Sequence, residues 1–298
     1  MNSRKIFIIL GVLQFFGCIG THSIVFPEVT QGKLNLIKFS FYNQTLPLKG
    51  DWNFKWNELS PPGSLNNTNT SYATVPSHWM EYKDQSGQSL PMVGKATFET
   101  EITIPEQENN LALRIPSMDT AYVIFWNGEE IARNSNLDRN HSEVFPQLYA
   151  PIICDITINP GKNILTLHLV NTKYPRPGFR DPITMGIASD LKLQNDRNIF
   201  IDVFLSGSLF LIFFYHIGLF LLRPQDKSTL YFSLFALFIS IRLSVTGEAF
   251  SFRFFPINWK ISTFLEYISF YLSPAIMILY IRKLYPHDGT SLDRKSVV

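Results

Sequence analysis

Few residues of this 298-residue chain have the types and spacing that chemistry requires. The acids Asp119, Glu129 and Glu130 lie in or beside expected strands, where single surface carboxylates are far more common than a glycosidase pair. The six histidines lack the spacing of metal ligands, and no nucleophile-elbow, zinc-protease, phosphate-loop or dinucleotide-binding motif is present. The sequence therefore predicts no catalytic residue, no metal and no cofactor, which argues against an enzyme.

Two opposite charges stand inside otherwise apolar segments. Arg242 is the one charged residue of 229–247, and Glu266 is the one charged residue of 261–281. Each lies about five residues from the outward end of its segment, which is a depth of about 7–8 Å at the rise of a helix. Lone charges at that depth are costly, so Arg242 and Glu266 are predicted to pair and to hold or switch the helices. The alternative is that each side chain extends separately to water.

Aromatic side chains of the N-terminal part could stack on a sugar ring. Trp79, Tyr149 and Tyr174 are the candidates for binding a ligand. The alternative is that these rings belong to the core, where most aromatic residues of β-sandwiches lie.

Alternating apolar and polar residues predict one all-β domain over residues 24–197. The segments 97–104 and 164–170 both alternate with the period of a half-buried strand. Asn127-Gly128 separates the expected strands 121–126 and 129–133 and supplies the positive φ angles of a hairpin turn. Short strands punctuated by Gly, Pro and Asn predict a β-sandwich.

Three apolar segments follow, within a predicted membrane region of 198–285. They cover about 203–222, 229–247 and 261–281, and each has the roughly 20 residues that cross a hydrocarbon layer as a helix. Trp259 and several phenylalanines occupy the second connection, as expected at a membrane interface.

The basic residues predict the orientation of these segments. If the sandwich is exported, six basic residues lie on the cytoplasmic side: Arg223, Lys227, Arg282, Lys283, Arg294 and Lys295. The outer connection holds two, Arg253 and Lys260. This distribution agrees with the positive-inside rule.

The N-terminus has the pattern of a targeting segment. Arg4 and Lys5 precede an apolar run over 6–19, which predicts a signal peptide over residues 1–23. An uncleaved anchor and a lipoprotein signal ending at Cys18 are the alternatives.

Composition excludes further classes. The net charge of +2 without a clustered basic face argues against nucleic acid as a partner. The two cysteines, one of them in the N-terminal apolar run, exclude a disulfide framework and a cysteine-based zinc site.

Several motifs resemble known families. The N-terminal part is similar to a galactose-binding-like jelly roll, related to the sugar-binding domain of β-galactosidase-like enzymes, in the segments 46–56 (LPLKGDWNFKW), 75–79 (VPSHW), 94–98 (GKATF), 121–128 (AYVIFWNG) and 160–163 (PGKN). The membrane part resembles the bacterial seven-transmembrane receptors with diverse intracellular signalling modules, in the segments 215–220 (YHIGLF), 226–232 (DKSTLYF), 241–242 (IR) and 265–267 (LEY).

The resemblance implies a fold, a location and a function. The fold is an all-β jelly-roll sandwich followed by α-helical transmembrane segments, in a multi-pass protein of the inner (cytoplasmic) membrane with a periplasmic N-terminal domain. The function is that of a receptor whose jelly roll binds a small ligand such as a carbohydrate and whose helices relay it to an intracellular output. The alternative is a membrane-tethered carbohydrate-binding module without signalling.

The chain departs from the receptor family in its number of spans. Three spans are predicted where the family has seven, and no output module follows the tail 286–298, so a truncated receptor is expected. The expected partners are the ligand, the lipid bilayer and a separate cytoplasmic signalling protein.

Overall fold

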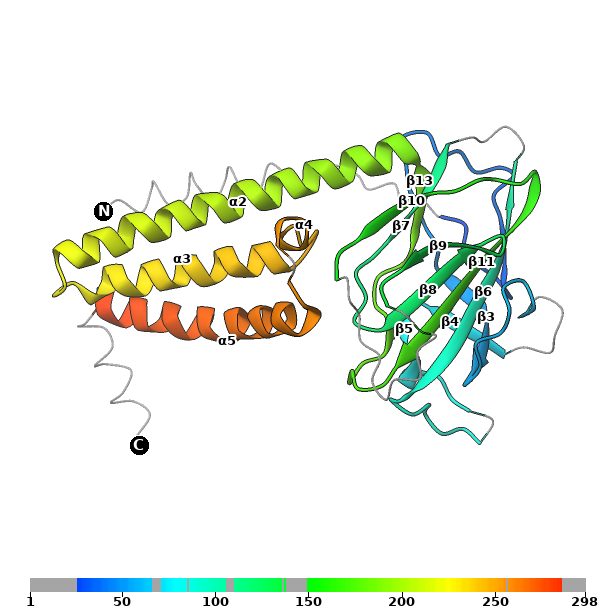
Figure 1. Cartoon of the computed structure of the whole chain (residues 1–298), viewed down its shortest axis with the longest axis horizontal. Coiled ribbons are helices and arrows are strands. Elements are labelled where there is room, and N and C mark those ends of the chain that lie inside the picture. Colours follow the sequence, from blue (N-terminus) through cyan, green and yellow to red (C-terminus); the bar gives the residue numbers. More distant parts are fainter. Residues whose placement is uncertain are drawn as a thin grey trace, which may run out of the picture.

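The structure is a computed structural model and describes residues 26–65, 71–84, 86–105, 110–135, 137, 149–255 and 257–285. The predicted signal peptide and the tail 286–298 lie outside these residues. A β-sandwich is followed by three long helices that extend away from it (Figure 1). This arrangement confirms the predicted fold class.

Two main sheets form the sandwich. The larger sheet has the order β4-β3-β6-β11-β8-β9, with β1 parallel to β6, and the smaller has the order β10-β7-β13-β2. A third, two-stranded sheet pairs β12 with β5. The strand bounds are β1 Lys33–Asn35, β2 Leu46–Pro47, β3 Gly50–Trp56, β4 Ser71–Val75, β5 Ser77–His78, β6 Gly94–Ile104, β7 Leu111–Ile115, β8 Ala121–Trp126, β9 Glu129–Arg133, β10 Ile152–Asp155, β11 Gly161–Asn171, β12 Gly178–Phe179 and β13 Thr184–Ile187.

The hairpin predicted at Asn127-Gly128 is confirmed. Strands β8 and β9 pair antiparallel across these two residues, and Trp126 lies opposite Glu129. Asn127 has a φ of 51° and Gly128 a φ of 85°, which are the left-handed values that a two-residue hairpin turn requires.

The core lies between the two sheets and is centred on β6 and β11. Phe98 of β6 packs edge-on against Phe179, whose ring also contacts Trp52, at centroid distances of 5.8 and 6.2 Å. All three rings are buried. A buried side chain of this size contributes about 1.5–3 kcal/mol relative to exposure. Because Phe179 belongs to β12, this cluster holds the two-stranded sheet against the larger one.

The central parts of strands β6 and β11 are buried on both faces, which corrects the half-buried expectation for 97–104 as well as for 164–170. Thr166 and His168, on the face opposite the leucines, are also buried. Gly63 and Leu65 lie in the segment after β3, and their main-chain N–H groups donate to the buried Glu99 carboxylate at 2.8 and 3.0 Å. This segment covers the outer face of the sheet, and the strand pattern gives no sign of such a cover.

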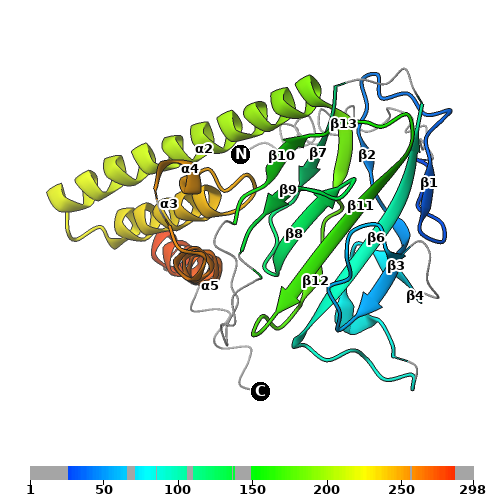
Figure 2. The same ribbon diagram turned by 45° about the vertical axis from the view of Figure 1, so that its right-hand side comes forward.

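Among the residues that the structure describes, three helices are long and apolar enough to cross a membrane. They are α2 (Ala188–Leu222), α3 (Lys227–Val245) and α5 (Trp259–Leu284), with the short α4 (Ser251–Phe254) in the second connection. Helix α3 lies between α2 and α5 (Figures 1 and 2). The three predicted spans are therefore confirmed as helices.

Helix α2 begins 15 residues before the predicted span at 203, and its first ten residues fall inside the segment 24–197 expected to be β-structure. Its 35 residues extend about 52 Å, against a hydrocarbon layer of about 30 Å. Hydropathy marks only the apolar part of such a helix. The polar first turns of α2 contact β7, β10 and β13, which are strands of the smaller sheet (Figure 2).

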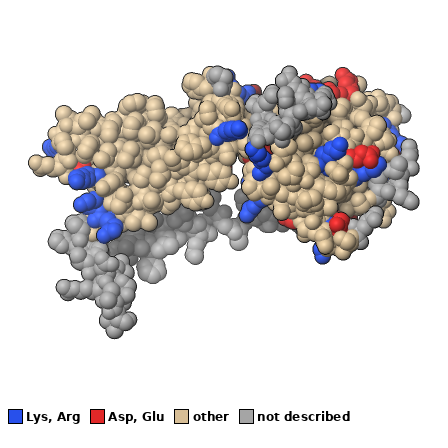
Figure 3. All heavy atoms as spheres, turned by 60° about the horizontal axis from the view of Figure 1, so that its bottom comes forward, with Lys and Arg blue, Asp and Glu red and all other residues tan. Residues whose placement is uncertain are grey.

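Small polar residues allow the helices to approach each other. The hydroxyls of Ser206 in α2 and Ser240 in α3 each donate to the other's main-chain carbonyl, at 3.0 and 2.9 Å. Both residues are buried between the helices. Close contacts of this kind associate helices in a lipid layer. On the face that Figure 3 shows, the helical part is a band without charges between basic residues at its two ends.

Candidate functional site at the junction of the sandwich and the helices

The sandwich and the helices meet around one buried carboxylate. Glu248, in the connection after α3, is 5% exposed. Its Oε1 accepts from the Arg114 guanidinium of β7 at 2.8 Å and from the Asn198 amide of α2 at 3.1 Å. Glu248 is part of the α3–α4 connection, and its side chain joins that connection to the smaller sheet and to helix α2.

The other oxygen of Glu248 extends this network. The buried Asn195 amide, oriented with its nitrogen toward Glu248, donates to Oε2 at 3.0 Å and accepts from Arg253 at 3.2 Å. The Glu248 main-chain N–H donates to Asp202 of α2 at 3.4 Å. We call Glu248, Arg114, Asn195, Asn198 and Arg253 the Glu248 network.

Local backbone geometry places Glu248 in this position. Helix α3 ends at Val245, and the Thr246 hydroxyl donates to the main-chain carbonyl of Arg242 at 2.8 Å. Gly247 then has a φ of 65°, the left-handed value that commonly ends a helix. A Cβ at Gly247 would lie 3.2 Å from the Asp202 carboxylate, so the absence of a side chain also lets the connection approach α2.

A second contact joins the sandwich to α5. Asp119, in the connection between β7 and β8, accepts from the indole N–H of Trp259 and from the Arg180 guanidinium, both at 3.3 Å. The Tyr174 ring packs edge-on against the Trp259 ring at 6.3 Å. We call Asp119, Tyr174, Arg180 and Trp259 the Asp119 cluster. Trp259 is the first residue of α5, so this cluster fixes the end of that helix nearest the sandwich.

The three candidate ligand-binding aromatics separate into two groups. Trp79 is fully buried in the core, and its indole N–H donates to the Pro91 carbonyl at 3.0 Å, so its ring has no face open to a sugar. Tyr149 and Tyr174 lie at the junction instead, and Tyr149 packs against Phe252 at 6.4 Å. Burial and the nearby Asp119 carboxylate raise the pKa of both tyrosine hydroxyls, which therefore stay neutral.

The structure brings the two predicted intramembrane charges together. Arg242 Nη1 of α3 donates to the main-chain carbonyl of Glu266 in α5 at 3.2 Å. The Arg242 guanidinium also lies 5.0 Å from the centroid of the Phe270 ring, a cation–π contact. The predicted carboxylate pairing stays a prediction, because the printed contact is made to the backbone of Glu266.

Sequence reasoning missed Arg114, Asp119 and Glu248 as junction residues. Glu248 directly follows an apolar span, which is a signal for a residue at the membrane surface, but nothing in the sequence indicates its partners. Among the residues that the structure describes, no group of three His, Cys, Asp or Glu side chains is placed to hold a metal ion.

An extramembrane β-sandwich bonded to three apolar helices defines a membrane protein with a folded domain outside the lipid layer. Residues 198–296, about a third of the chain, match the family model described as 7TM diverse intracellular signalling, a receptor family. A comparison with curated proteins gives no match.

Solved structures of glycoside-cleaving enzymes resemble part of the chain. They include Faecalibacterium prausnitzii β-glucuronidase (16% identity, TM-score 0.37), a β-glycosidase from Bacteroides vulgatus (15%, 0.36) and a glycosyl hydrolase family 2 member from Bacteroides cellulosilyticus (13%, 0.38). Each match covers 48% of this chain but only 31%, 20% and 20% of the respective enzyme.

Proposed function

We propose that this chain is the sensory part of a receptor in the inner (cytoplasmic) membrane, with its sandwich on the periplasmic side. The sandwich binds a small ligand such as a carbohydrate, and the helices relay the bound state to a cytoplasmic signalling protein. The family match of residues 198–296 supports a receptor. The ligand and the relay are the parts that require experiment.

The observation that carries this proposal is the ion pair of Arg114 with the buried Glu248 carboxylate, between the sandwich and the α3–α4 connection. A simple tether needs only one covalent connection, and burying an unnecessary ion pair costs free energy. Here the sandwich also contacts α5 through Asp119 and Trp259. A change in the sandwich would therefore reach all three helices.

The proposed orientation is supported by the charges at the far end of the helices. Arg223, Lys227, Arg282 and Lys283 lie at the end remote from the sandwich, where Figure 3 shows basic residues beyond the uncharged band. Positive residues favour the cytoplasmic side of a membrane. The predicted signal peptide, if it acts in export, gives the same orientation.

The relay requires two arrangements of the sandwich and helices that a ligand binds with different affinity. To test it, the full chain in lipid nanodiscs would be screened against an array of neutral and acidic sugars, and hydrogen exchange would be measured with and without the bound sugar. We expect altered exchange in residues 246–255 and in the first turns of α2. Binding without any change in these segments would favour the tethered binding module.

An Arg114→Met variant provides the matched control. It removes the ion pair to Glu248 and leaves the rest of the sandwich in place. We expect it to bind the same sugar as the natural chain and to lose the change in exchange at 246–255. An unchanged response in this variant would contradict a relay through the Glu248 network.

A further inference from the structure

A cleft of 640 Å³ lies between the sandwich and the first turns of α2. Residues 43–45 and Phe26 line its sandwich side, and one face of α2 lines the other. The helix contributes positions 190, 193, 194, 197 and 198, which have the i, i+3, i+4, i+7 and i+8 spacing of a single helix face. The volume falls in the range of small-molecule sites.

The lining is rich in groups that bind hydroxyls. Asn43 and Gln194 each provide an amide that both donates and accepts, and Thr45 adds a hydroxyl with the same capacity. The Gln44 amide nitrogen already donates to the Ser40 carbonyl, so its oxygen and remaining N–H are left for a ligand in the cleft. A sugar hydroxyl also donates and accepts, so it matches these groups. The half-exposed Phe26 ring offers an apolar surface to the C–H groups of a sugar ring.

Arg197 gives the cleft a cation without a partner. Its side chain is exposed, and its guanidinium makes no hydrogen bond or ion pair within the described part of the chain. A guanidinium is the side chain best suited to a carboxylate, which it binds through two parallel hydrogen bonds. An acidic group on the ligand would therefore lie at this end of the cleft.

Asp190 marks the other end and limits the class of ligand. It lies seven residues from Arg197 on the same helix face, which is about 10 Å along the axis. An α-amino acid carries its ammonium and carboxylate on one carbon and cannot reach both side chains. A sugar can place a carboxylate at Arg197 and hydroxyls toward Asp190, whose carboxylate already accepts from the Ser189 hydroxyl at 3.2 Å.

We infer that this cleft binds a small sugar acid, such as a hexuronate or a disaccharide that contains one, with its carboxylate on Arg197. The inference rests on the proposed receptor function and gives it a site and a ligand class. Asn198 both lines the cleft and donates to Glu248 at 3.1 Å, so the site is continuous with the Glu248 network. Occupancy of the cleft would then act on the contact between the sandwich and the helices.

The test uses the full chain in lipid nanodiscs and measures the binding of D-glucuronate, D-galacturonate, D-glucose, D-galactose and L-glutamate by calorimetry. We expect the uronates to bind more tightly than the neutral sugars and glutamate. Arg197→Gln should weaken uronate binding about 10- to 100-fold, the loss of one charge-assisted contact. The variant should fold normally, because the guanidinium is exposed and bonds to none of the residues that the structure describes.

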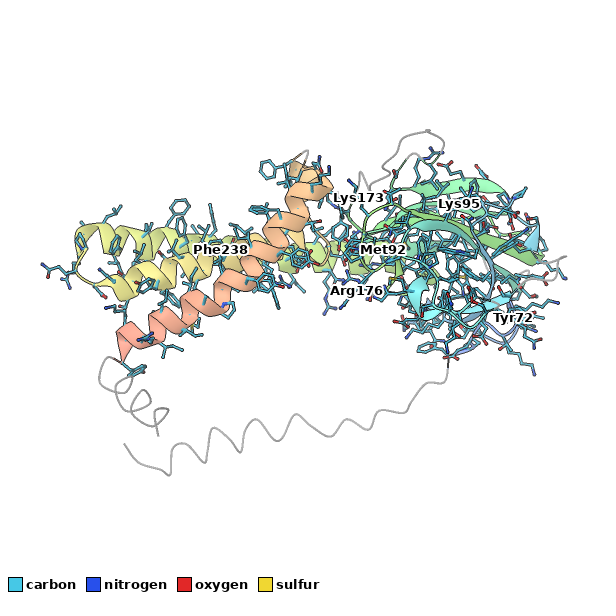
Figure 4. All side chains as sticks on the ribbon, turned by 90° about the horizontal axis from the view of Figure 1, so that it is seen from below. Tyr72, Met92, Lys95, Lys173, Arg176 and Phe238 are labelled. Carbon is cyan, nitrogen blue, oxygen red and sulfur yellow. The ribbon has the colours of Figure 1, made fainter. Side chains whose placement is uncertain are left out.

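Arg176→Gln is the matched control. Arg176 is exposed in the connection between β11 and β12, does not line the cleft, and lies on the side of the sandwich that faces the helices (Figure 4). We expect this variant to bind uronates as the natural chain does. An equal loss of uronate affinity in both variants would mean that the uronate is attracted by positive charge in general, and it would overturn the inference.

Three other results would overturn the inference in distinguishable ways. Uronate binding that survives Arg197→Gln would place the ligand elsewhere, and the proposed receptor function would stand. Tighter binding of a neutral sugar or of glutamate would refute the ligand class alone. No binding of any sugar, here or on the wider array, would refute both the inference and the carbohydrate part of the proposed function.

Discussion

Arg114 of β7 and Glu248 of the α3–α4 connection form an ion pair of 2.8 Å although they are 134 positions apart in the chain. The Glu248 side chain is 6% exposed and that of Arg114 is 26% exposed. Together with the Asp119–Trp259 contact, this pair joins the sandwich to the ends of the helices nearest to it. A receptor needs such a bonded junction, because a ligand can act on the helices only through contacts that differ between two states.

The Arg114–Glu248 pair should contribute strongly to stability. Arg114→Met leaves a buried carboxylate without its cation, and loss of one partner of a deeply buried pair costs about 3–5 kcal/mol. Because Arg114 keeps some contact with water, we expect a loss of about 2–3 kcal/mol. Chemical unfolding of the full chain in detergent micelles, followed by tryptophan fluorescence, measures this change.

The chain offers a matched control for that experiment. Lys192 of α2 and Asp155 of β10 also join a helix to the sandwich, at 2.7 Å, but their side chains are 51% and 64% exposed. Lys192→Met should therefore cost less than about 1 kcal/mol. Similar losses in the two variants would show that burial does not strengthen the Arg114–Glu248 contact.

Removing the charge of Arg242 should lower the stability and folded yield of the protein more than removing the charge of Glu266. Arg242→Gln removes both the hydrogen bond to the Glu266 carbonyl and the contact with the Phe270 ring, and we expect a loss of about 1–2 kcal/mol and a lower folded yield. Glu266→Gln keeps the main-chain acceptor and should change the yield much less. Folded yield in the membrane fraction, measured by size-exclusion chromatography, separates the two variants.

A direct pairing of the two side-chain charges predicts a different result. In that case Glu266→Gln and Arg242→Gln would be equally harmful, and the exchanged pair Arg242→Glu with Glu266→Arg would restore the yield. If the exchanged pair restores the yield, the hydrogen bond from Arg242 to the Glu266 carbonyl is not the main contact. That result would support the pairing of the two side chains that the sequence predicts.

Local signals explain which parts of the fold could be predicted from the sequence. The turn at Asn127-Gly128 depends on φ angles that these two residues adopt readily, and the alternation over 97–104 lies within a single strand. The lipid-facing parts of the helices follow from hydropathy. The start of α2 at Ala188 could not be predicted in this way, because its first turns are polar and are stabilised by the sandwich.

The junction could not be predicted, because its partners are remote in the chain. No period or motif connects Arg114 with Glu248, and Asp119 meets Trp259 only after both the sandwich and α5 have folded. The aromatic candidates show the same limit. The sequence marks Trp79 and Tyr174 as equally suitable for a ligand, but only the fold separates a buried ring from one at the junction.

Substitution of Glu99 should destabilise the sandwich more than substitution of most of its other polar residues. Its fully buried carboxylate accepts from the Gly63 and Leu65 N–H groups and from the Thr166 hydroxyl, at 2.8, 3.0 and 2.8 Å. Glu99→Gln places an amide donor against these donors, so we expect a loss of about 2–4 kcal/mol in the free energy of unfolding. Chemical unfolding monitored by circular dichroism measures the loss.

Glu101 of the same strand is the control for Glu99. Its carboxylate pairs with Lys162 at 3.0 Å, and although the Glu101 side chain is only 14% exposed, its cation partner is 72% exposed and well solvated. Glu101→Gln should therefore change the free energy of unfolding by less than about 1 kcal/mol. If Glu99→Gln were equally mild, the segment after β3 would not depend on the buried carboxylate for its position over the sheet.

His168 should make the sandwich less stable as the pH falls from about 7 to 5. Burial lowers its pKa below the ordinary value of 6.5, and its Nε2 donates to the Ser60 carbonyl at 2.8 Å. The unfolded chain then takes up a proton near pH 6.5 that the folded chain accepts only at lower pH, so the free energy of unfolding decreases with falling pH. Thermal unfolding at half-unit pH intervals measures this slope.

His168→Gln identifies the source of that pH dependence. A glutamine amide can donate to the Ser60 carbonyl and does not titrate, so we expect a flatter profile between pH 7 and 5. Hydrogen bonds from Lys55 and Ser60 lower the pKa of Glu58 below its ordinary value of 4.5, so its titration lies outside this window. A slope that is identical in the natural chain and in His168→Gln would assign the pH dependence to another group and would contradict a neutral, buried His168.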